Sequence, residues 1–214
     1  MSSSTQSNTL ADVLKWEESG NHSREAVTIA SGENMAVNEV AGKITKSTPA
    51  TGTAGGGNTG SGTCTSVTAG ENAKIGTYTM TALSATSFAV KDPDGYALPD
   101  ATVDSAYTNA HLNFTINDGS PDFIAGDSFT IAVAAGSGNI VPVDFSAVDG
   151  TQDAYGITCA DYDASAAALA GVLVVRNAGI MPDDLVWPSG ATAGQKAAAL
   201  AQLKTAGIIE TTEV

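Results

Sequence analysis

The sequence has few of the side chains on which most catalytic and metal sites depend. It contains two histidines and two cysteines in 214 residues. His22 and His111 lie far apart, and neither Cys64 nor Cys159 has metal-ligand spacing around it. The glycine-rich stretch GTAGGGNTGSG has no lysine ending and follows no helix-bearing unit, so it is no phosphate-binding loop. We therefore expect no enzyme, no cofactor and no metal site. Two distant cysteines are simplest as free thiols in a reducing compartment.

Basic residues are also scarce. Nine Lys and Arg face 23 Asp and Glu, for a formal net charge of −14. Such a surface repels phosphates and anionic lipid headgroups, which argues against nucleic acid and membranes as partners. The sequence has no apolar run of transmembrane length, and its first residues lack the basic start and apolar centre of a signal peptide.

Aromatic residues make up 6% of the chain, so we expect a core built mainly on Val, Ile, Leu and Ala. Charged residues make up 15%, below the roughly 25% that is usual for globular domains. Glycine, serine, threonine and asparagine take their place, and these residues favour strands and turns over long helices. The composition predicts a mainly β fold.

Two glycine-rich breaks divide the chain. The first, STPATGTAGGGNTGSGT, covers residues 47–63, and the second, AAGSGN, covers 134–139. Between them, short segments alternate apolar and polar residues: TCTSVTA, IGTYTMTAL, SFAVKDP, LNFTIND and SFTIAVAAG. DPDG at 92–95 is typical of a hairpin turn. We expect residues 47–135 to be a linker followed by an inserted small β-sandwich that looks immunoglobulin-like.

The remaining residues, 21–46 plus 136–214, have the size of one host domain. We expect strands at 25–32 and at 37–46, the latter interrupted at Gly42. Two more strands are expected around a turn at Asp149 and Gly150, and one buried strand at 171–180.

One clear helix is expected, at the end of the chain. Thr192 can cap it with Gln195 as its capping-box partner, and Gly207 can end it. Its apolar stripe would be Ala199, Leu200 and Leu203.

The N-terminal residues 1–20 are expected to form an arm. Its serine-rich start cannot bury enough apolar surface to order alone. Val13, Leu14 and Trp16 nevertheless lie close together, which favours docking on a partner. Packing of Trp16 on its own domain is the alternative.

Several host segments resemble the tailed-phage head decoration family of the lambda decoration protein type. They are HSREAVTIASG, AGKIT, VPVDFSAVDGTQDAYGI, GVLVVRNAGI and, most specific, LVWPSGATAGQKAAALAQLKTAGI. The resemblance covers the host segments and leaves out the insertion. It implies a β-tulip domain with a short C-terminal helix and no catalysis. It also implies a homotrimer that binds the major capsid protein on the outer surface of the expanded capsid, at three-fold and quasi-three-fold positions. Such a protein would be made in the host cytoplasm and stabilise the shell, with residues 1–20 as its capsid-binding arm.

Four residues near the end of the chain have two possible structural roles. Trp187, Pro188, Leu200 and Leu203 can support the core or a trimer interface, since aromatic residues are enriched in both. The aspartates Asp92, Asp94, Asp118, Asp122 and Asp127 are expected to be solvated turn residues, with a calcium site as a minor alternative.

Two other functions stay open. One is a different virion surface or fibre subunit, with the β insertion binding a host surface or glycan. The other is a free carbohydrate-binding or hydrolytic β domain. A fibre would show internal repeats, and the sequence has none.

Overall fold

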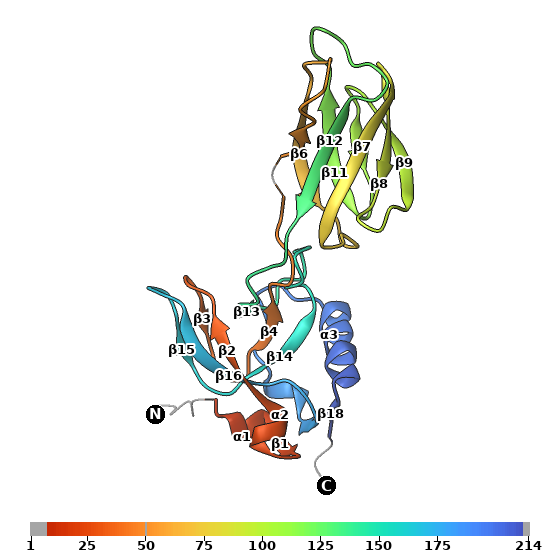
Figure 1. Ribbon diagram of the computed structural model, residues 1–214. Coiled ribbons are helices and arrows are strands. Elements are labelled where there is room, and N and C mark those ends of the chain that lie inside the picture. Colours follow the sequence, from red (N-terminus) through yellow and green to blue (C-terminus); the bar gives the residue numbers. More distant parts are fainter. Residues whose placement is uncertain (1–7, 50, 212–214) are drawn as a thin grey trace. The chain divides into compact units, whose positions relative to one another are not determined.

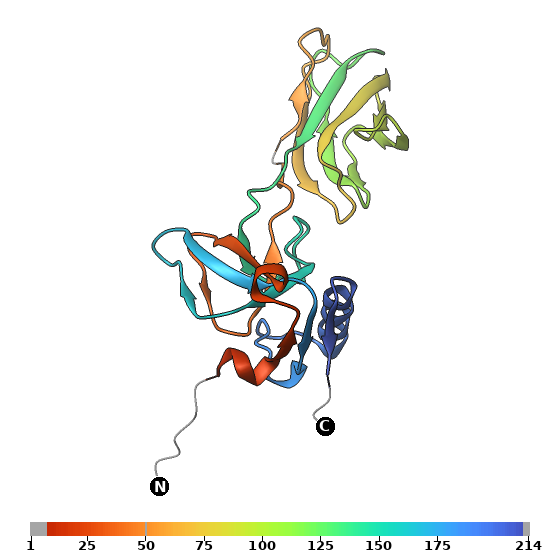
Figure 2. The same ribbon diagram turned by 60° about the horizontal axis from the view of Figure 1, so that its bottom comes forward.

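The structure is a computed structural model that describes residues 8–49 and 51–211 (Figures 1 and 2). The chain divides into two compact units. Met1–Thr45 and Gly138–Val214 form the first, here called the barrel unit, and Lys46–Ser137 form the second, here called the inserted unit. Strands predominate in both, and the longest helix is near the C-terminus, as predicted.

A closed five-stranded barrel forms the centre of the barrel unit, in the order β13-β2-β16-β14-β4. Its strands are β2 (Arg24–Ile29), β4 (Val40–Lys43), β13 (Ile140–Pro142), β14 (Ala154–Thr158) and β16 (Leu169–Val174). Ile29, Ile140 and Leu173 pack together inside it without exposed surface. β4 runs through Gly42, where the sequence predicted an interruption. A Cβ atom there would lie 2.3 Å from the Thr151 carbonyl oxygen, so glycine permits close backbone packing.

A three-stranded sheet, β1-β17-β18, lies at one end of the barrel unit (Figure 1). The smaller elements of this unit are α1 (Leu10–Val13), β1 (Leu14–Glu17), α2 (Gly20–Ser23), β3 (Asn34–Met35), β15 (Tyr162–Asp163), β17 (Ala178–Ile180), a 3-10 helix (Pro182–Asp184) and β18 (Ile208–Glu210). The prediction of one strand over 171–180 was wrong. The run is split between β16 and β17 because the chain turns at Asn177, whose φ is 45°.

The C-terminal helix α3 (Ala193–Thr205) has the predicted ends. The Gln195 N–H donates to Thr192 Oγ1 at 3.3 Å, and Gln195 Oε1 accepts the Thr192 N–H at 2.9 Å. Gly207 follows the helix with a φ of 81°, a left-handed conformation that glycine adopts without steric cost. Ala199 and Leu203 are buried on the side of α3 that packs on β14 and β18.

The inserted unit consists of two sheets around one core, β10-β11-β6 and β5-β12-β7-β8-β9. Its strands are β5 (Thr53–Ala54), β6 (Thr63–Ala69), β7 (Gly76–Ser84), β8 (Ser87–Lys91), β9 (Ala97–Thr102), β10 (Ala106–Thr108), β11 (Leu112–Asn117) and β12 (Ser128–Val133). The five predicted strands are present, and the DPDG turn joins β8 to β9 with Gly95 at a φ of 86°. β5, β9 and β10 were not predicted. The immunoglobulin-like character stays a prediction.

The glycine-rich segment before β6 is part of this unit, where the sequence predicted a linker. β5 pairs with β12, and Gly60 and Gly62 lie against Phe123. A Cβ atom would come within 2.6 Å of the Phe123 side chain at Gly60 and 2.2 Å at Gly62. These glycines therefore permit close packing on an aromatic ring, which local composition does not reveal.

The inserted unit interrupts a β-hairpin of the barrel. β4 and β13 are antiparallel, with Lys43 opposite Ile140. The Ile44 N–H donates to the Asn139 carbonyl at 3.0 Å, and the Gly138 N–H donates to the Ile44 carbonyl at 2.9 Å. The two points where the chain leaves and re-enters the barrel unit are thus neighbours. Over the described residues, no helix has the length and hydropathy to span a membrane.

Candidate functional site

The β1-β17-β18 sheet has one buried and one exposed face. Ala178, Ile180 and Ile208 face the core and are at most 2% exposed. On the other face, Trp16 of β1 is opposite Gly179 of β17, which is opposite Ile209 of β18. Trp16 is 56% exposed and Ile209 is 46% exposed. We call Trp16 and Ile209 the Trp16 surface.

Gly179, which lies between these two side chains in the strand pairing, is itself buried. A Cβ atom at Gly179 would lie 2.8 Å from Thr211 Cγ2 and 3.6 Å from the Trp16 Cβ atom. A larger residue would displace a neighbour, because the Thr211 and Trp16 side chains already cover this glycine. The exposed apolar area of this face is therefore that of Trp16 and Ile209.

An ion pair holds the strand that carries Trp16. Arg24 on β2 donates from Nε to Glu17 Oε2 at 3.0 Å and from Nη2 to Glu17 Oε1 at 2.8 Å. The hydrogen-bonded Glu17 carboxylate raises the pKa of Arg24. A two-point contact of this type fixes orientation as well as distance.

Residues 8–20 do not form the independent arm that the sequence predicted. Val13 has no exposed surface, and Leu14 is half-buried against the same apolar cluster. Val13 is therefore wrong as a docking residue, because the core encloses it. The reason lies far away in the sequence, since β1 pairs with β17. Trp16 stays a docking prediction. Residues 1–7 lie outside the described residues.

The predicted support residues near α3 lie around one apolar cluster. Leu203 is 1% exposed, while Leu200 and Trp187 are half-buried and pack on the same cluster. The Trp187 ring stacks on Phe145 with centroids 6.5 Å apart, and Lys196 Nζ lies 5.7 Å from its centre. Core support is thus visible for these side chains. A role at a trimer interface stays a prediction.

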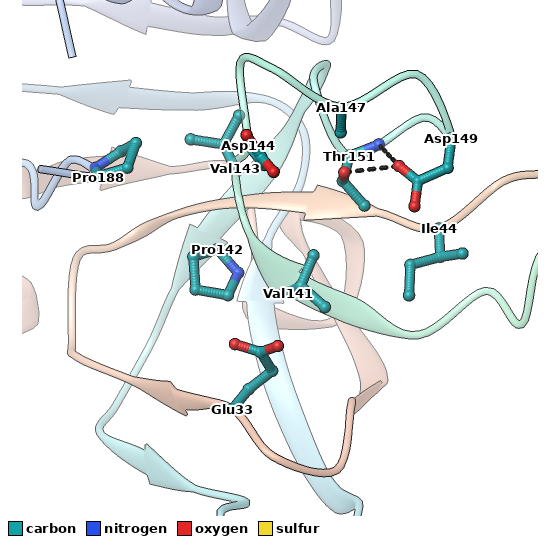
Figure 3. A pocket seen from close by; sticks show the side chains of 10 residues that line it. All are labelled: Glu33, Ile44, Val141, Pro142, Val143, Asp144, Ala147, Asp149, Thr151 and Pro188. Carbon is teal, nitrogen blue, oxygen red and sulfur yellow. Dashed lines mark hydrogen bonds between the residues drawn. The ribbon is translucent and has the colours of Figure 1, made fainter. Parts of the chain in front are cut away.

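Pro188 lines an open depression of about 450 Å³ on the barrel unit. Figure 3 shows its lining: Glu33, Ile44, Val141, Pro142, Val143, Asp144, Ala147, Asp149, Thr151 and Pro188. Asp149 Oδ1 accepts the Thr151 N–H at 3.1 Å and its hydroxyl at 2.6 Å, as the dashed lines mark.

Asp144, another carboxylate of this depression, also caps a turn. Its Oδ1 accepts the hydroxyl of Ser146 at 2.6 Å and the Ser146 N–H at 2.9 Å, and these bonds lower the pKa of Asp144. The lining residues include no histidine, cysteine or lysine. Within residues 8–49 and 51–211, no group of three or more His, Cys, Asp or Glu could hold a metal ion.

The aspartates of the inserted unit have partners within the chain. Lys74 Nζ lies 2.6 Å from both Asp92 and Asp94. Their carboxylates raise the pKa of Lys74, and Lys74 in turn lowers that of Asp92. Asp127, 3% exposed, accepts backbone N–H groups of Thr59 and Gly60, both at 2.8 Å. These carboxylates lie in turns, as the sequence indicated, but the expectation that they are solvated is wrong for Asp92 and Asp127, which are buried.

Both cysteines are free thiols, as predicted. Burial raises the pKa of Cys64 to about 11 and also raises that of Cys159. Protonated thiols at neutral pH are weak nucleophiles.

Sequence reasoning missed Gly179 and Ile209. The signal for Ile209 was the β-branched pair Ile208–Ile209 directly after the helix-ending Gly207. No local signal marks Gly179, because its role depends on the two strands beside it.

A protein-family model described as "Bacteriophage lambda head decoration protein D" matches residues 3–208. No curated protein matches the chain. Two crystal structures of Xanthomonas campestris FlgL, in space groups H3 and C2, match with 17% identity and a TM-score of 0.32. The matches cover 49% and 50% of this chain and 33% and 34% of the FlgL chain. The chain thus spans about a third of those structures, and a likeness this low supports no argument.

Proposed function

Since the chain belongs to the bacteriophage lambda head decoration protein D family, we propose that it binds as a homotrimer to the outer surface of the expanded capsid and stabilises the shell. Family membership makes it a structural, non-enzymatic capsid protein of the virion. The proposal adds the trimer, the three-fold and quasi-three-fold positions, the outer surface and the major capsid protein as partner.

The observation that carries this proposal is the family match over residues 3–208. The geometry suggests which face meets the shell. The Trp16 surface combines two exposed apolar side chains on an ordered sheet. Figure 1 shows β1 and β18 at the end of the barrel unit away from β13, and the chain leaves and re-enters the barrel unit beside the β4–β13 pair. Contact through Trp16 therefore leaves both attachment points of the inserted unit directed away from the shell.

The test uses purified protein and expanded phage heads that lack decoration protein. Co-sedimentation measures binding, electron microscopy of the decorated heads shows lattice positions, and sedimentation velocity gives the oligomeric state. Trp16→Ser and Ile209→Ser should each weaken head binding on the order of tenfold or more, because apolar anchors dominate interface energetics.

Matched controls come from the inserted unit. Tyr96 is 70% exposed and Leu83 is 54% exposed, so Tyr96→Ser and Leu83→Ser remove similar exposed apolar surface elsewhere. These two variants should bind heads like the wild type. Wild-type protein that fails to bind heads would refute the proposed function. Normal binding by both Trp16→Ser and Ile209→Ser would refute only this choice of surface.

A further inference from the structure

Asn38 occupies a fixed, buried position just before β4. It has no exposed surface, and its φ is 65°, in the left-handed region. Its N–H donates to the Thr158 carbonyl at 3.1 Å, and its carbonyl accepts the Val186 N–H at 2.9 Å. The backbone of Asn38 is thus held by two segments of the barrel unit that lie far away in the sequence.

The side-chain amide of Asn38 binds the start of the described N-terminal segment. Nδ2 donates to the Thr9 carbonyl at 2.6 Å and to Asn8 Oδ1 at 3.0 Å. Asn8 Nδ2 in turn donates to the Asp184 carbonyl at 3.1 Å. Residues 8 and 9 are therefore held from two sides, by the barrel and by the 3-10 helix.

Both hydrogen bonds that Asn38 Nδ2 donates go to the N-terminal segment. Among the described residues, Asn38 Oδ1 has no hydrogen-bond partner. Glycine would adopt a φ of 65° with less strain, so the backbone conformation does not call for asparagine. What the asparagine side chain adds at this position is the contact with Asn8 and Thr9.

A second left-handed asparagine holds the other end of the same segment. Asn177, with a φ of 45°, donates from Nδ2 to Glu18 Oε2 at 2.8 Å, and its carbonyl accepts the Glu18 N–H at 3.2 Å. Trp16 lies between these two anchors, on a strand that shows an irregular register between Leu14 and Trp16. Trp16 is thus held by these two anchors together with the β1–β17 pairing and the Glu17–Arg24 ion pair.

We propose that Asn38 is a positioning residue for head attachment: its buried amide anchors Asn8 and Thr9, and so helps to fix how the segment of residues 8–17 presents Trp16. This inference rests on the proposed function. It assigns Asn38 no contact with the shell itself.

The variant that tests it is Asn38→Gly, which keeps the left-handed backbone and removes the amide. Asp104→Gly is the matched control. Asp104 is also left-handed, with a φ of 57°, and its Oδ1 accepts the Asp118 N–H at 2.9 Å in the inserted unit. Three quantities are measured on the full chain: amide hydrogen exchange of residues 8–17, affinity for undecorated heads, and the thermal midpoint.

For Asn38→Gly we expect faster exchange of residues 8–17 and head binding weaker on the order of tenfold, because three loosened segments act together in a trimer. Asp104→Gly should leave both unchanged. Unchanged exchange in Asn38→Gly would overturn the anchoring. Faster exchange with normal head affinity would overturn the positioning role. The positioning role would also be overturned if both variants lost head affinity in proportion to the fall in their thermal midpoints. Exchange is read without heads, so a failure of wild-type protein to bind heads would count against the proposed function and leave the anchoring result intact.

Discussion

The two units of the chain use their aromatic residues in opposite ways. In the inserted unit all the tyrosines and phenylalanines except Tyr96 are buried: Tyr78, Phe88, Tyr107, Phe114, Phe123 and Phe129. In the barrel unit none of the described aromatic side chains is fully buried, and Trp16 and Trp187 keep part of their rings at the surface. The inserted unit thus has a complete core of its own. The barrel unit has an aliphatic core, and four of its rings pack on the edge of that core while staying partly exposed.

The overall aromatic content of a chain therefore does not show how aromatic side chains are divided between the cores of its two units. A chain with 6% aromatic residues predicted an aliphatic core throughout. That expectation is correct for the barrel unit and wrong for the inserted unit, where rings from both sheets meet. Phe88 contacts Phe123 edge-on with centroids 5.0 Å apart and Phe129 at 5.8 Å. Such contacts add to the free energy of burial.

Deletion of the inserted unit is the largest change that tests whether the two units have separate cores. Deleting residues 46–137 and joining Thr45 to Gly138 leaves a two-residue hairpin connection between Ile44 and Asn139, which already share a hydrogen bond. We expect a soluble protein that keeps one calorimetric transition and binds heads. An insoluble product, or one that no longer binds heads, would show that the inserted unit is needed for the barrel unit to fold or attach.

Phe88→Ala should produce the largest effect of a single substitution. Phe88 is fully buried among other rings, so its loss should destabilise the inserted unit by about 3–5 kcal/mol. Differential scanning calorimetry should show one transition moving to lower temperature while the other stays in place. Equal shifts of both transitions would contradict separate cores.

Trp187→Ala tests the barrel unit and should cost less. Trp187 is half-buried against Phe145 and Lys196, so we expect about 1–3 kcal/mol from the apolar area that it buries. Differential scanning calorimetry should show the transition of the barrel unit moving to lower temperature while that of the inserted unit stays in place. If the cost in isolated protein is negligible but head binding falls, the ring acts between molecules.

Acid should weaken the inserted unit through Asp127. Backbone N–H groups of Thr59, Gly60 and Ile124 lower the pKa of Asp127 in the folded state. A lowered folded pKa means that the carboxylate stabilises the fold above its unfolded pKa, and that this contribution is lost as pH falls through the folded pKa. The transition of the inserted unit should therefore move to lower temperature below about pH 4. In Asp127→Asn this part of the pH dependence should be absent, and an unchanged pH profile would contradict the assignment.

Local patterns predicted much of the fold. Residues 63–69 form the strand that their alternation indicated, and Thr192 and Gln195 form the predicted capping box. The failures have a common physical cause. Val13 is buried because β1 pairs with β17, and Gly60 is ordered because it lies on Phe123. In each case the deciding neighbour is far away in the sequence.

The candidate site was predictable only in part. Trp16 was identified because a lone large aromatic stood in a polar segment. Ile209 joins its surface only through strand pairing across Gly179. Asn38 carried no signal at all, since its amide contacts Asn8 and Thr9 only after the chain has folded.

The β4–β13 hairpin makes the inserted unit exchangeable at the level of the gene. Its two boundaries, Thr45 and Gly138, are separated by a whole folded unit in sequence but adjoin residues one hydrogen bond apart in space. A recombination event needs to match only these two junctions, because the pairing of β4 with β13 fixes the strand register within the barrel unit. Any module whose own ends lie about one strand spacing apart, near 5 Å, meets that condition. We therefore expect that the barrel unit can lose or exchange the inserted unit without a change in the surface that carries Trp16.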